Sequence, residues 1–342
     1  MERFELCSVA VLQPFMKFLN ARGIDADGYL EGQYIPPEMV ASGEGKIIKK
    51  QAWKFFNEVE RREGIDTLGF LGGDDYSIQD LGSLGSSLQE AVTLKDAIDT
   101  FSYLIWSFAE GNSIWLQQGA IYSWLCCRTE MFDHRVRAAD HHTILILREI
   151  IRLAAGPHWQ PDEIWLCSEP SNALRKLPGF SSVKTEFLKD SAGIRFESTL
   201  LPVPPIKGNQ SNILGSVEYN PTESPPESIQ GALHQFLTSQ LTHGYLPSVD
   251  EVLEILDTSR MTLFRSLAAD GMNYRKLVER VRFNRAVHLL KNSPLSVKEI
   301  AHELCYTAPN NFSRAFLRLS GQTPRAYKAN FHKKSMNGED NH

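Results

Sequence analysis

The stretch SVKEIAHELCYTAPNNFSRAFLRLSGQTPR, residues 296–325, decides the fold of the C-terminal part of the chain, because an earlier copy of it is present. The earlier copy reads SVDEVLEILDTSRMTLFRSLAADGMNYR and covers residues 248–275. The offset between the copies is 48 residues at their first serines and 50 at their last glycines, so they differ by short insertions in turns. A duplication of this kind predicts two copies of one supersecondary unit.

Each copy opens with the same helix-starting signal. Ser248 is followed three residues later by Glu251, and Ser296 by Glu299. A serine side chain can accept from the backbone N–H three residues on while the glutamate reaches back, which forms a capping box. We therefore expect helices to begin at both serines, with Val249, Val252, Leu253 and Leu256 on the inner face of the first and Val297, Ile300, Ala301 and Leu304 on that of the second.

A second helix of roughly ten residues follows in each copy and completes a helix-turn-helix pattern, over residues 248–268 and 296–319. It is expected to bury Leu263 and Leu267 in the first unit and Phe312 and Phe316 in the second. Its other face is rich in the Arg and Asn side chains that suit contacts with base edges in the major groove. The candidate DNA-contacting residues are Arg260, Met261, Thr262, Phe264 and Arg265 in the first unit and Asn310, Asn311, Ser313 and Arg314 in the second.

The segment between the two units reads as one continuous helix over residues 273–291. Its inward residues are Leu277, Val281, Ala286, Leu289 and Leu290. At 1.5 Å per residue it is about 28 Å long, close to the roughly 34 Å between successive turns of one groove face. It could therefore hold two recognition helices in neighbouring segments of one major groove.

The rest of the chain divides at a segment rich in proline and glycine. We expect an α+β effector-binding and dimerisation domain over residues 1–205, a linker over 206–227, an all-α DNA-binding domain over 228–332 and a tail over 333–342. In the first domain, helices are expected at 51–62, 88–108 and 140–155, and strands at 113–118, 120–128, 163–168 and 183–187. A hairpin is expected around Gly119, which supplies a permissive backbone for its turn.

Composition limits the class of protein. Hydrophobic residues at 42% and charged residues at 23% are typical of a globular chain, and neither a bilayer-spanning apolar run nor a secretion signal is evident, so we expect a cytoplasmic protein. Residues 228–342 carry 15 Lys and Arg against 10 Asp and Glu, which leaves 21 against 31 for residues 1–227. A basic part beside an acidic part suits a nucleic-acid module joined to a different domain. The five cysteines suit neither a disulfide framework nor a CxxC pair.

With these motifs in view, residues 230–330 resemble the AraC/XylS family of bacterial regulators. The most specific parts are FSRAF at 312–316 and GQTP at 321–324, and the segments 81–108, 159–170 and 202–205 are similar to the arabinose-binding-like N-terminal domain of one branch. The resemblance implies binding to double-stranded promoter or operator DNA, a small-molecule effector, and a homodimer that contacts RNA polymerase, as an activator would, on the nucleoid. Where the family usually has Gly-Phe, this chain has Cys305-Tyr306, and a left-handed cysteine would cost about 1 kcal/mol.

Aromatic residues crowd residues 101–124 and could line a pocket for an apolar or cationic ligand, although core packing is the simpler interpretation for any one of them. The candidate effector-binding residues are Tyr103, Trp106, Trp115, Tyr122, Trp124 and Arg128. His134, His141 and His142 lie near Asp133 and Asp140, but the spacing fits no metal-ligand pattern. We expect no metal, no cofactor and no catalytic residues, since no nucleophile elbow, phosphate loop or dinucleotide fingerprint is present.

Several alternatives remain open at this point. The duplication could build only a plain helical bundle, in which Arg265 and Arg314 are solvated and Met261 and Phe264 are packing residues. Asn310 could cap its helix, and Cys305 could be a redox sensor or an inert cysteine. The chain could also be a DNA-tethered enzyme or repair protein, or an interaction hub whose DNA module no longer binds DNA.

Overall fold

The structure is a computed structural model, and it describes residues 4–71, 76–81, 83–130, 136–171, 174, 179–206, 226, 228–269 and 271–336. The chain forms two compact units, Glu5–Pro225 and a unit made of Pro226–His342 with Met1–Phe4. Apart from Ile206 and Pro226, the expected linker lies outside the described residues. Among the described helices, none is long and apolar enough to cross a membrane.

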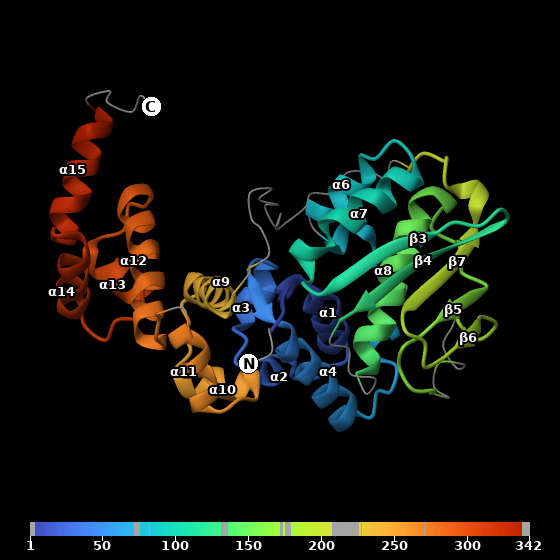
Figure 1. Ribbon diagram of the computed structural model, residues 1–342, viewed down its shortest axis with the longest axis horizontal. Coiled ribbons are helices and arrows are strands. Elements are labelled where there is room, and N and C mark those ends of the chain that lie inside the picture. The colour runs from blue at the N-terminus through green and yellow to red at the C-terminus, as the bar shows by residue number, and fades with distance from the viewer. Residues whose placement is uncertain are drawn as a thin grey trace. The chain divides into compact units, whose positions relative to one another are not determined.

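The N-terminal unit is built around a five-stranded sheet (Figure 1). Its strands are β3 (Asn112–Gln117), β4 (Tyr122–Thr129), β5 (Glu163–Trp165), β6 (Lys184–Glu186) and β7 (Ala192–Glu197), in the order β3-β4-β7-β5-β6. Strands β5 and β6 are parallel and the other pairs are antiparallel. A separate antiparallel pair joins β1 (Leu6–Ser8) to β2 (Lys46–Ile48). The four expected strands are thus confirmed, while β1, β2 and β7 were not anticipated.

The expected hairpin is present. Its glycine is required because there is no room for a side chain, and not because its backbone has a positive φ. Strands β3 and β4 pair from Asn112 opposite Thr129 to Gln117 opposite Trp124. A Cβ atom on Gly119 would lie 2.3 Å from the backbone oxygen of Tyr122, whereas its φ is not positive. A side chain at this position would therefore collide with the opposite limb of the turn.

Helices α7 (Leu94–Phe108) and α8 (Arg137–Ala155) pack against the strands of this sheet. The other helices of the unit are α1 (Gln13–Ala21), α2 (Ala26–Glu31), α3 (Pro37–Ser42), α4 (Lys49–Glu63), α5 (Leu68–Leu71) and α6 (Ser83–Gln89), with 3-10 turns η1 (Val9–Leu12), η2 (Ile78–Leu81) and η4 (Ser198–Leu200). The three expected helices correspond to α4, α7 with the end of α6, and α8. Helix α8 packs against β4, β7, α4, α5 and α7, so it is buried on nearly every side. We call the sheet face that α8 covers the inner face, and the opposite one the outer face.

The described part of the C-terminal unit contains helices and no strands. The helices are α9 (Ile229–Thr242), α10 (Val249–Leu256), α11 (Arg260–Ala269), α12 (Tyr274–Asn292), α13 (Val297–Glu303), α14 (Pro309–Ser320) and α15 (Pro324–Met336). Helix α12 packs against α9, α13 and α15, while α11 contacts α9 and α10, and α14 contacts α13 and α15. The long connecting helix is thus confirmed, and α15 continues four residues into the expected tail.

Candidate nucleic-acid interface

Both helix-turn-helix pairs begin with the capping box that the sequence predicts. The Ser248 hydroxyl accepts from the Glu251 N–H at 3.3 Å, and the Glu251 carboxylate accepts from the Ser248 N–H at 2.6 Å. At Ser296 and Glu299 the same two distances are 3.3 and 2.7 Å. The first helix of each unit is therefore positioned by the same local hydrogen bonds.

The inner faces are largely as expected, with corrections for Val297 in the second unit, which is only half-buried, and for three residues of the first unit. Leu263, Leu267, Phe312 and Phe316 are fully buried, as are all five inward residues predicted for α12. In α10, however, the buried residues are Val252 and Ile255, while Val249, Leu253 and Leu256 are only half-buried. The core therefore lies along a spacing of three residues, and this short helix is rotated relative to the predicted face.

Helix α12 contacts both helix-turn-helix units, so it can control the spacing between these two units. Near its start, the Tyr274 hydroxyl donates to the backbone oxygen of Pro247 at 2.6 Å, just before α10. Farther along, the Phe283 ring lies 5.3 Å from that of Phe316 in α14. An ion pair of 3.0 Å also joins Glu279 on α12 to Arg318 on α14.

The turns of the two units share a left-handed residue. Asp257 has a φ of 52° and Cys305, at the equivalent position, a φ of 54°. The left-handed conformation at Cys305 therefore persists without glycine, and the Arg282 guanidinium supports it by donating to the Cys305 backbone oxygen at 2.7 Å. The thiol is half-buried, donates to the Gly244 backbone oxygen at 3.2 Å, and has its pKa raised by burial.

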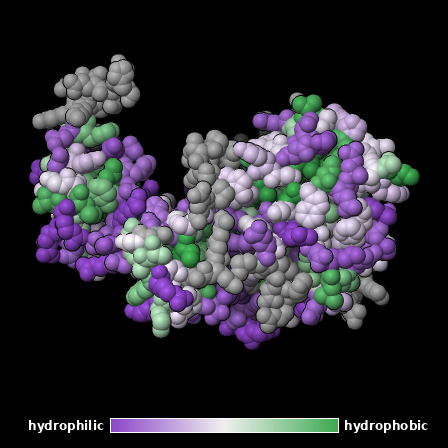
Figure 2. All heavy atoms as spheres, in the orientation of Figure 1, coloured by the Kyte–Doolittle hydropathy of each residue, from purple (hydrophilic) through white to green (hydrophobic). Residues whose placement is uncertain are grey.

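The nine predicted DNA-contacting residues lie on the outward faces of α11 and α14. Arg260, Met261, Phe264, Arg265, Asn310, Asn311 and Arg314 are exposed, and Thr262 and Ser313 are half-buried. On the face of the C-terminal unit that Figure 2 shows, hydrophilic side chains surround a smaller hydrophobic patch. The two apolar candidates, Met261 and Phe264, are 78% and 41% exposed, so neither is a core residue.

Local contacts distinguish these exposed side chains from one another. Arg314 donates to the Asn311 side-chain oxygen at 2.8 Å, and Arg260 pairs with Asp250. Arg265 has no hydrogen bond or ion pair to any residue that the structure describes. Its guanidinium is exposed, so it is available to an external partner.

Two residues that contribute to this surface were not predicted from the sequence. Ser259 accepts from the Thr262 N–H at 3.1 Å and so caps α11, and Asp250 orients Arg260. The serine could have been recognised as a cap because it directly precedes the helix. Asn310 does not cap α14, since the residue at the capping position is Ala308.

In the N-terminal unit, the described residues line a partly open cavity of about 80 Å³ between the inner face of the sheet, α4, α7 and α8. Its polar lining residues are Lys49, Asn112, Thr129, Asp140, His142 and Thr143. None of the six predicted effector-binding residues lines it. The signal that could have revealed it is the polar run at 140–143, which is buried or half-buried within α8.

The predicted effector-binding residues lie elsewhere and are only partly brought together. Tyr103 is 73% exposed and Trp106 is half-buried, both on α7. Trp115, Tyr122, Trp124 and Arg128 share the outer face of β3 and β4 by their register. There, Arg128 lies 5.8 Å from the Trp115 ring, and Trp124 stacks on Trp165 at 3.7 Å.

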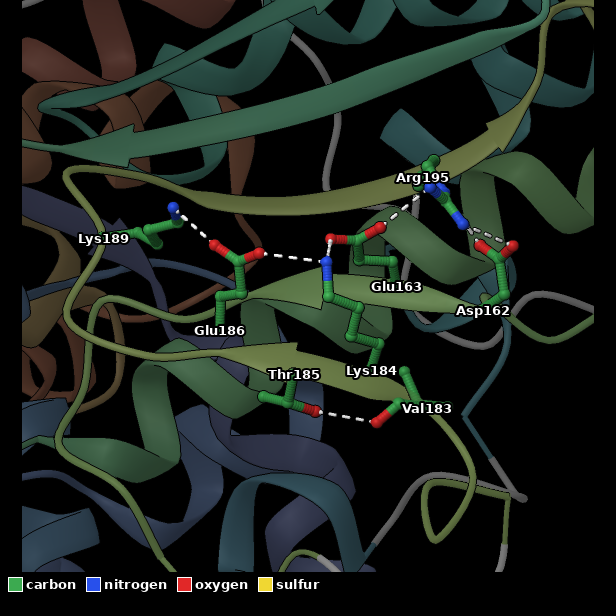
Figure 3. A network of polar contacts seen from close by, with 8 residues as sticks. All are labelled: Asp162, Glu163, Val183, Lys184, Thr185, Glu186, Lys189 and Arg195. Carbon is green, nitrogen blue, oxygen red and sulfur yellow. Dashed lines mark hydrogen bonds and ion pairs between the residues drawn. The ribbon is translucent and has the colours of Figure 1, made fainter.

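Charged side chains on the same outer face are paired with one another (Figure 3). Arg195 on β7 contacts Asp162 at 2.7 Å and Glu163 at 2.8 Å. Lys184 joins Glu163 to Glu186, which also pairs with Lys189. These charges neutralise one another, so they do not form a site that selects a ligand of one sign.

The metal interpretation of the histidines finds no support in the part of the chain that the structure describes. His134 and Asp133 lie outside the described residues, and among those described no group of three or more His, Cys, Asp or Glu is arranged to hold a metal ion. His141 instead stacks on Phe70 at 4.4 Å. Burial lowers its pKa to about 3.

With this geometry established, comparison with known proteins identifies the family. Residues 23–204, more than half of the chain, match the arabinose-binding N-terminal domain of AraC transcription regulators. The chain belongs to the AraC family of transcription regulators. Residues 252–330 of this AraC-family chain match a helix-turn-helix domain as well.

Individual relatives agree with this assignment over different lengths. The chain is 35% identical to the transcriptional regulator VqsM of Pseudomonas aeruginosa over 86 residues, which is 25% of this chain and 26% of VqsM. It is 21% identical to the ornithine utilization regulator of the same organism over 328 residues, 95% of this chain and 96% of that protein. It thus spans about a quarter of the length of the former. The crystal structure of CdpR from Pseudomonas aeruginosa aligns with 92% of this chain and 96% of its own, at 18% identity and a TM-score of 0.37.

Proposed function

We propose that this protein is a transcription regulator that binds specific DNA sequences through α11 and α14 and is controlled by a small molecule bound in its N-terminal unit. The observation that carries the proposal is the pair of equivalent, capped helix-turn-helix units whose outward helices expose Arg265 and Arg314. Arginine is the side chain that most often reads guanine, through two parallel hydrogen bonds. The exposed Met261 and Phe264 supply apolar surface for thymine methyl groups.

The proposal extends to how the protein works in the cell. We infer a homodimer that acts on the chromosome in the cytoplasm and contacts RNA polymerase from its DNA site. A regulatory role is favoured over thiol-based repair chemistry, because burial raises the pKa of the Cys126 and Cys127 thiols to about 12. A thiol held in its protonated form is a weak nucleophile.

The test starts from genome-wide mapping of the DNA bound by the full chain, followed by titration of the recovered duplex. Arg265→Ala and Arg314→Ala are each expected to weaken binding to that duplex by about 1–3 kcal/mol, which is about 5- to 150-fold. Arg61→Ala is the matched control, since Arg61 is an exposed arginine of the other unit with a side chain 68% accessible. Equal affinity of wild type and both variants for every duplex would refute the assignment of these helices.

A further inference from the structure

The two edge strands of the five-stranded sheet differ in their protection against pairing with another chain. Strand β6 ends the sheet on one side and has three residues, of which Lys184 and Glu186 are charged. Strand β3 ends the sheet on the other side and has six residues, none of them charged and none a proline. Short edge strands and charged side chains are common means by which proteins prevent edge-to-edge pairing. Strand β6 therefore has this protection, whereas β3 lacks it.

The pairing between β3 and β4 determines which backbone groups of β3 point away from the sheet. The Glu130 N–H donates to the Gly111 backbone oxygen at 2.9 Å, in a pair that continues the register of the two strands. Hydrogen-bonded positions alternate along an antiparallel pair. Every second residue after Gly111 therefore bonds to β4, and the residues between them, including Ile114 and Leu116, direct their N–H and C=O groups outward.

The outward groups of Ile114 and Leu116 have no hydrogen-bond partner among the residues that the structure describes. Neither N–H donates to a described acceptor, and neither C=O accepts from a described donor. A row of such groups is a template on which a further strand can pair. Each copy of the chain thus offers two donors and two acceptors along one edge.

The surroundings of β3 fit a second copy of the same chain. Residues 111–127 contain no charged side chain, whereas residues 1–227 carry 21 Lys and Arg against 31 Asp and Glu. Two acidic units repel each other, so they associate best through a surface on which like charges do not face each other. Apolar side chains are also exposed close to β3 in the chain, at 73% for Tyr103 on α7, which packs against β3, and at 72% for Ile121 in the turn after it.

We propose that β3 pairs in antiparallel fashion with β3 of a second copy, so that the two sheets join across a two-fold axis. Ile114 of each copy exchanges backbone hydrogen bonds with Leu116 of the other, which uses all the outward groups of both residues. Trp115 then lies opposite Trp115 of the second copy, in a non-hydrogen-bonded pair, where side chains approach most closely. The two-fold axis makes the contact self-complementary. This inference rests on the proposed function, because it names the interface of the homodimer inferred there.

Proline substitution tests the backbone pairing, with the mass of the full chain measured by sedimentation equilibrium. Leu116→Pro removes an outward N–H from each copy and keeps the pairing with β4, because an edge strand tolerates proline where its nitrogen faces away from the sheet. Leu116→Ala shortens the side chain and keeps the N–H, so it is the matched control. We expect wild type and Leu116→Ala to be dimers and Leu116→Pro to be a monomer at the same concentration. A monomeric wild type, or a Leu116→Pro dimer as tight as that of Leu116→Ala, would overturn the proposal.

Disulfide cross-linking tests the register and does not depend on whether Leu116→Pro folds. The Cα atoms of a non-hydrogen-bonded pair lie about 4.5 Å apart, which a disulfide can span. Trp115→Cys should therefore link two copies when dissolved oxygen oxidises the thiols, in a Cys305→Ser chain whose other natural cysteines are buried. Ser113→Cys is the matched control, since it lies on the same face of β3 but about 13 Å from its own counterpart in the proposed register. No linked dimer from Trp115→Cys, or an equal yield from Ser113→Cys, would contradict the proposed pairing.

Duplex binding, measured on the same preparations, separates this inference from the proposed function. A monomeric wild type whose duplex binding depends on Arg265 would overturn the strand pairing and leave the DNA-binding proposal. A linked Trp115→Cys dimer without specific duplex binding would overturn the regulator proposal and leave the interface.

Discussion

Arg282 connects the long helix to the strained turn of the second helix-turn-helix unit. Its guanidinium donates to the Cys305 backbone oxygen at 2.7 Å and lies 4.3 Å from the centre of the Tyr306 ring. Cys305 has a φ of 54°, a conformation that non-glycine residues adopt at a cost of about 1–2 kcal/mol. We predict that Arg282→Met destabilises the C-terminal unit, because it removes the contact that offsets this cost.

The size of the effect follows from the contacts that are lost. A hydrogen bond from a charged donor contributes about 1.5–3 kcal/mol, and a cation–π contact at an accessible site about 0.5–1 kcal/mol. Methionine keeps the apolar stem, and it also removes the Arg282 Nε atom, which is buried without a hydrogen-bond partner in the described structure. The expected loss is therefore at the lower end, about 2 kcal/mol, or about 1 M in urea midpoint at an m-value of about 2 kcal/mol per molar.

The chain itself provides two probes that separate its units in this assay. All six tryptophans precede residue 226, so tryptophan fluorescence reports unfolding of the N-terminal unit, whereas far-UV circular dichroism also follows the helices of the C-terminal unit. Arg282→Met should lower the midpoint of the dichroism transition and leave the fluorescence transition unchanged. Arg275→Met, on the same helix at a side chain 85% accessible, is the matched control. Equal midpoints in the two variants would refute the role of Arg282.

Three further predictions concern stability and reactivity. His142 has a pKa of about 4 in the folded chain against 6.5 when exposed. The unfolded state therefore binds the proton first as pH falls, and the free energy of unfolding should drop by up to about 1.4 kcal/mol per pH unit between pH 6.5 and 4. His142→Gln should reduce this slope in urea titrations at several pH values. An unchanged slope in the variant would contradict this origin. Ser248→Ala and Ser296→Ala should each lower the dichroism-detected stability by about 1 kcal/mol, with threonine a milder change, and no loss at either serine would contradict the capping boxes. Of the five cysteines only Cys305 is not buried, so a thiol reagent should label one site in the native chain and none rapidly in Cys305→Ser; rapid labelling of the variant would show that another thiol is accessible.

The C-terminal unit could be predicted closely because its determinants are local in sequence. A capping box lies within four residues, and the inner face of a helix repeats every three or four residues, so both can be read without knowing the tertiary fold. All five inward residues of α12 are buried as predicted. The error in α10 has the same origin, because an eight-residue helix contains too few turns to distinguish a face centred on Ile255 from one centred on Leu256.

The strands of the N-terminal unit were harder to predict because their pairing joins distant segments. Strand β7 alternates in burial, with Ile194 and Phe196 inward and Arg195 outward. This alternation does not reveal that its partners in the sheet are β4 and β5, which are separated from it in the sequence. Strands β1 and β2 contain three residues each, too few to show alternation. Nothing local in the sequence specifies that Leu6 pairs with Ile48 across four helical or 3-10 elements.

Four of the residues predicted to bind the effector, Trp115, Tyr122, Trp124 and Arg128, lie on the outer face of the sheet, and the sequence alone could not show which face the helices cover. Successive residues of β4 point to opposite faces, so Trp124 and Arg128 lie on the outer face while Leu125 and Cys127 lie on the inner one. The alternation is visible in the sequence, but the face that the helices cover is set by tertiary packing. Aromatic residues are conspicuous on the outer face, where Trp124 stacks on Trp165 and the charges pair among themselves. The inner face carries fewer conspicuous residues, yet Asn112, Cys127 and Thr129 on this face line the cavity.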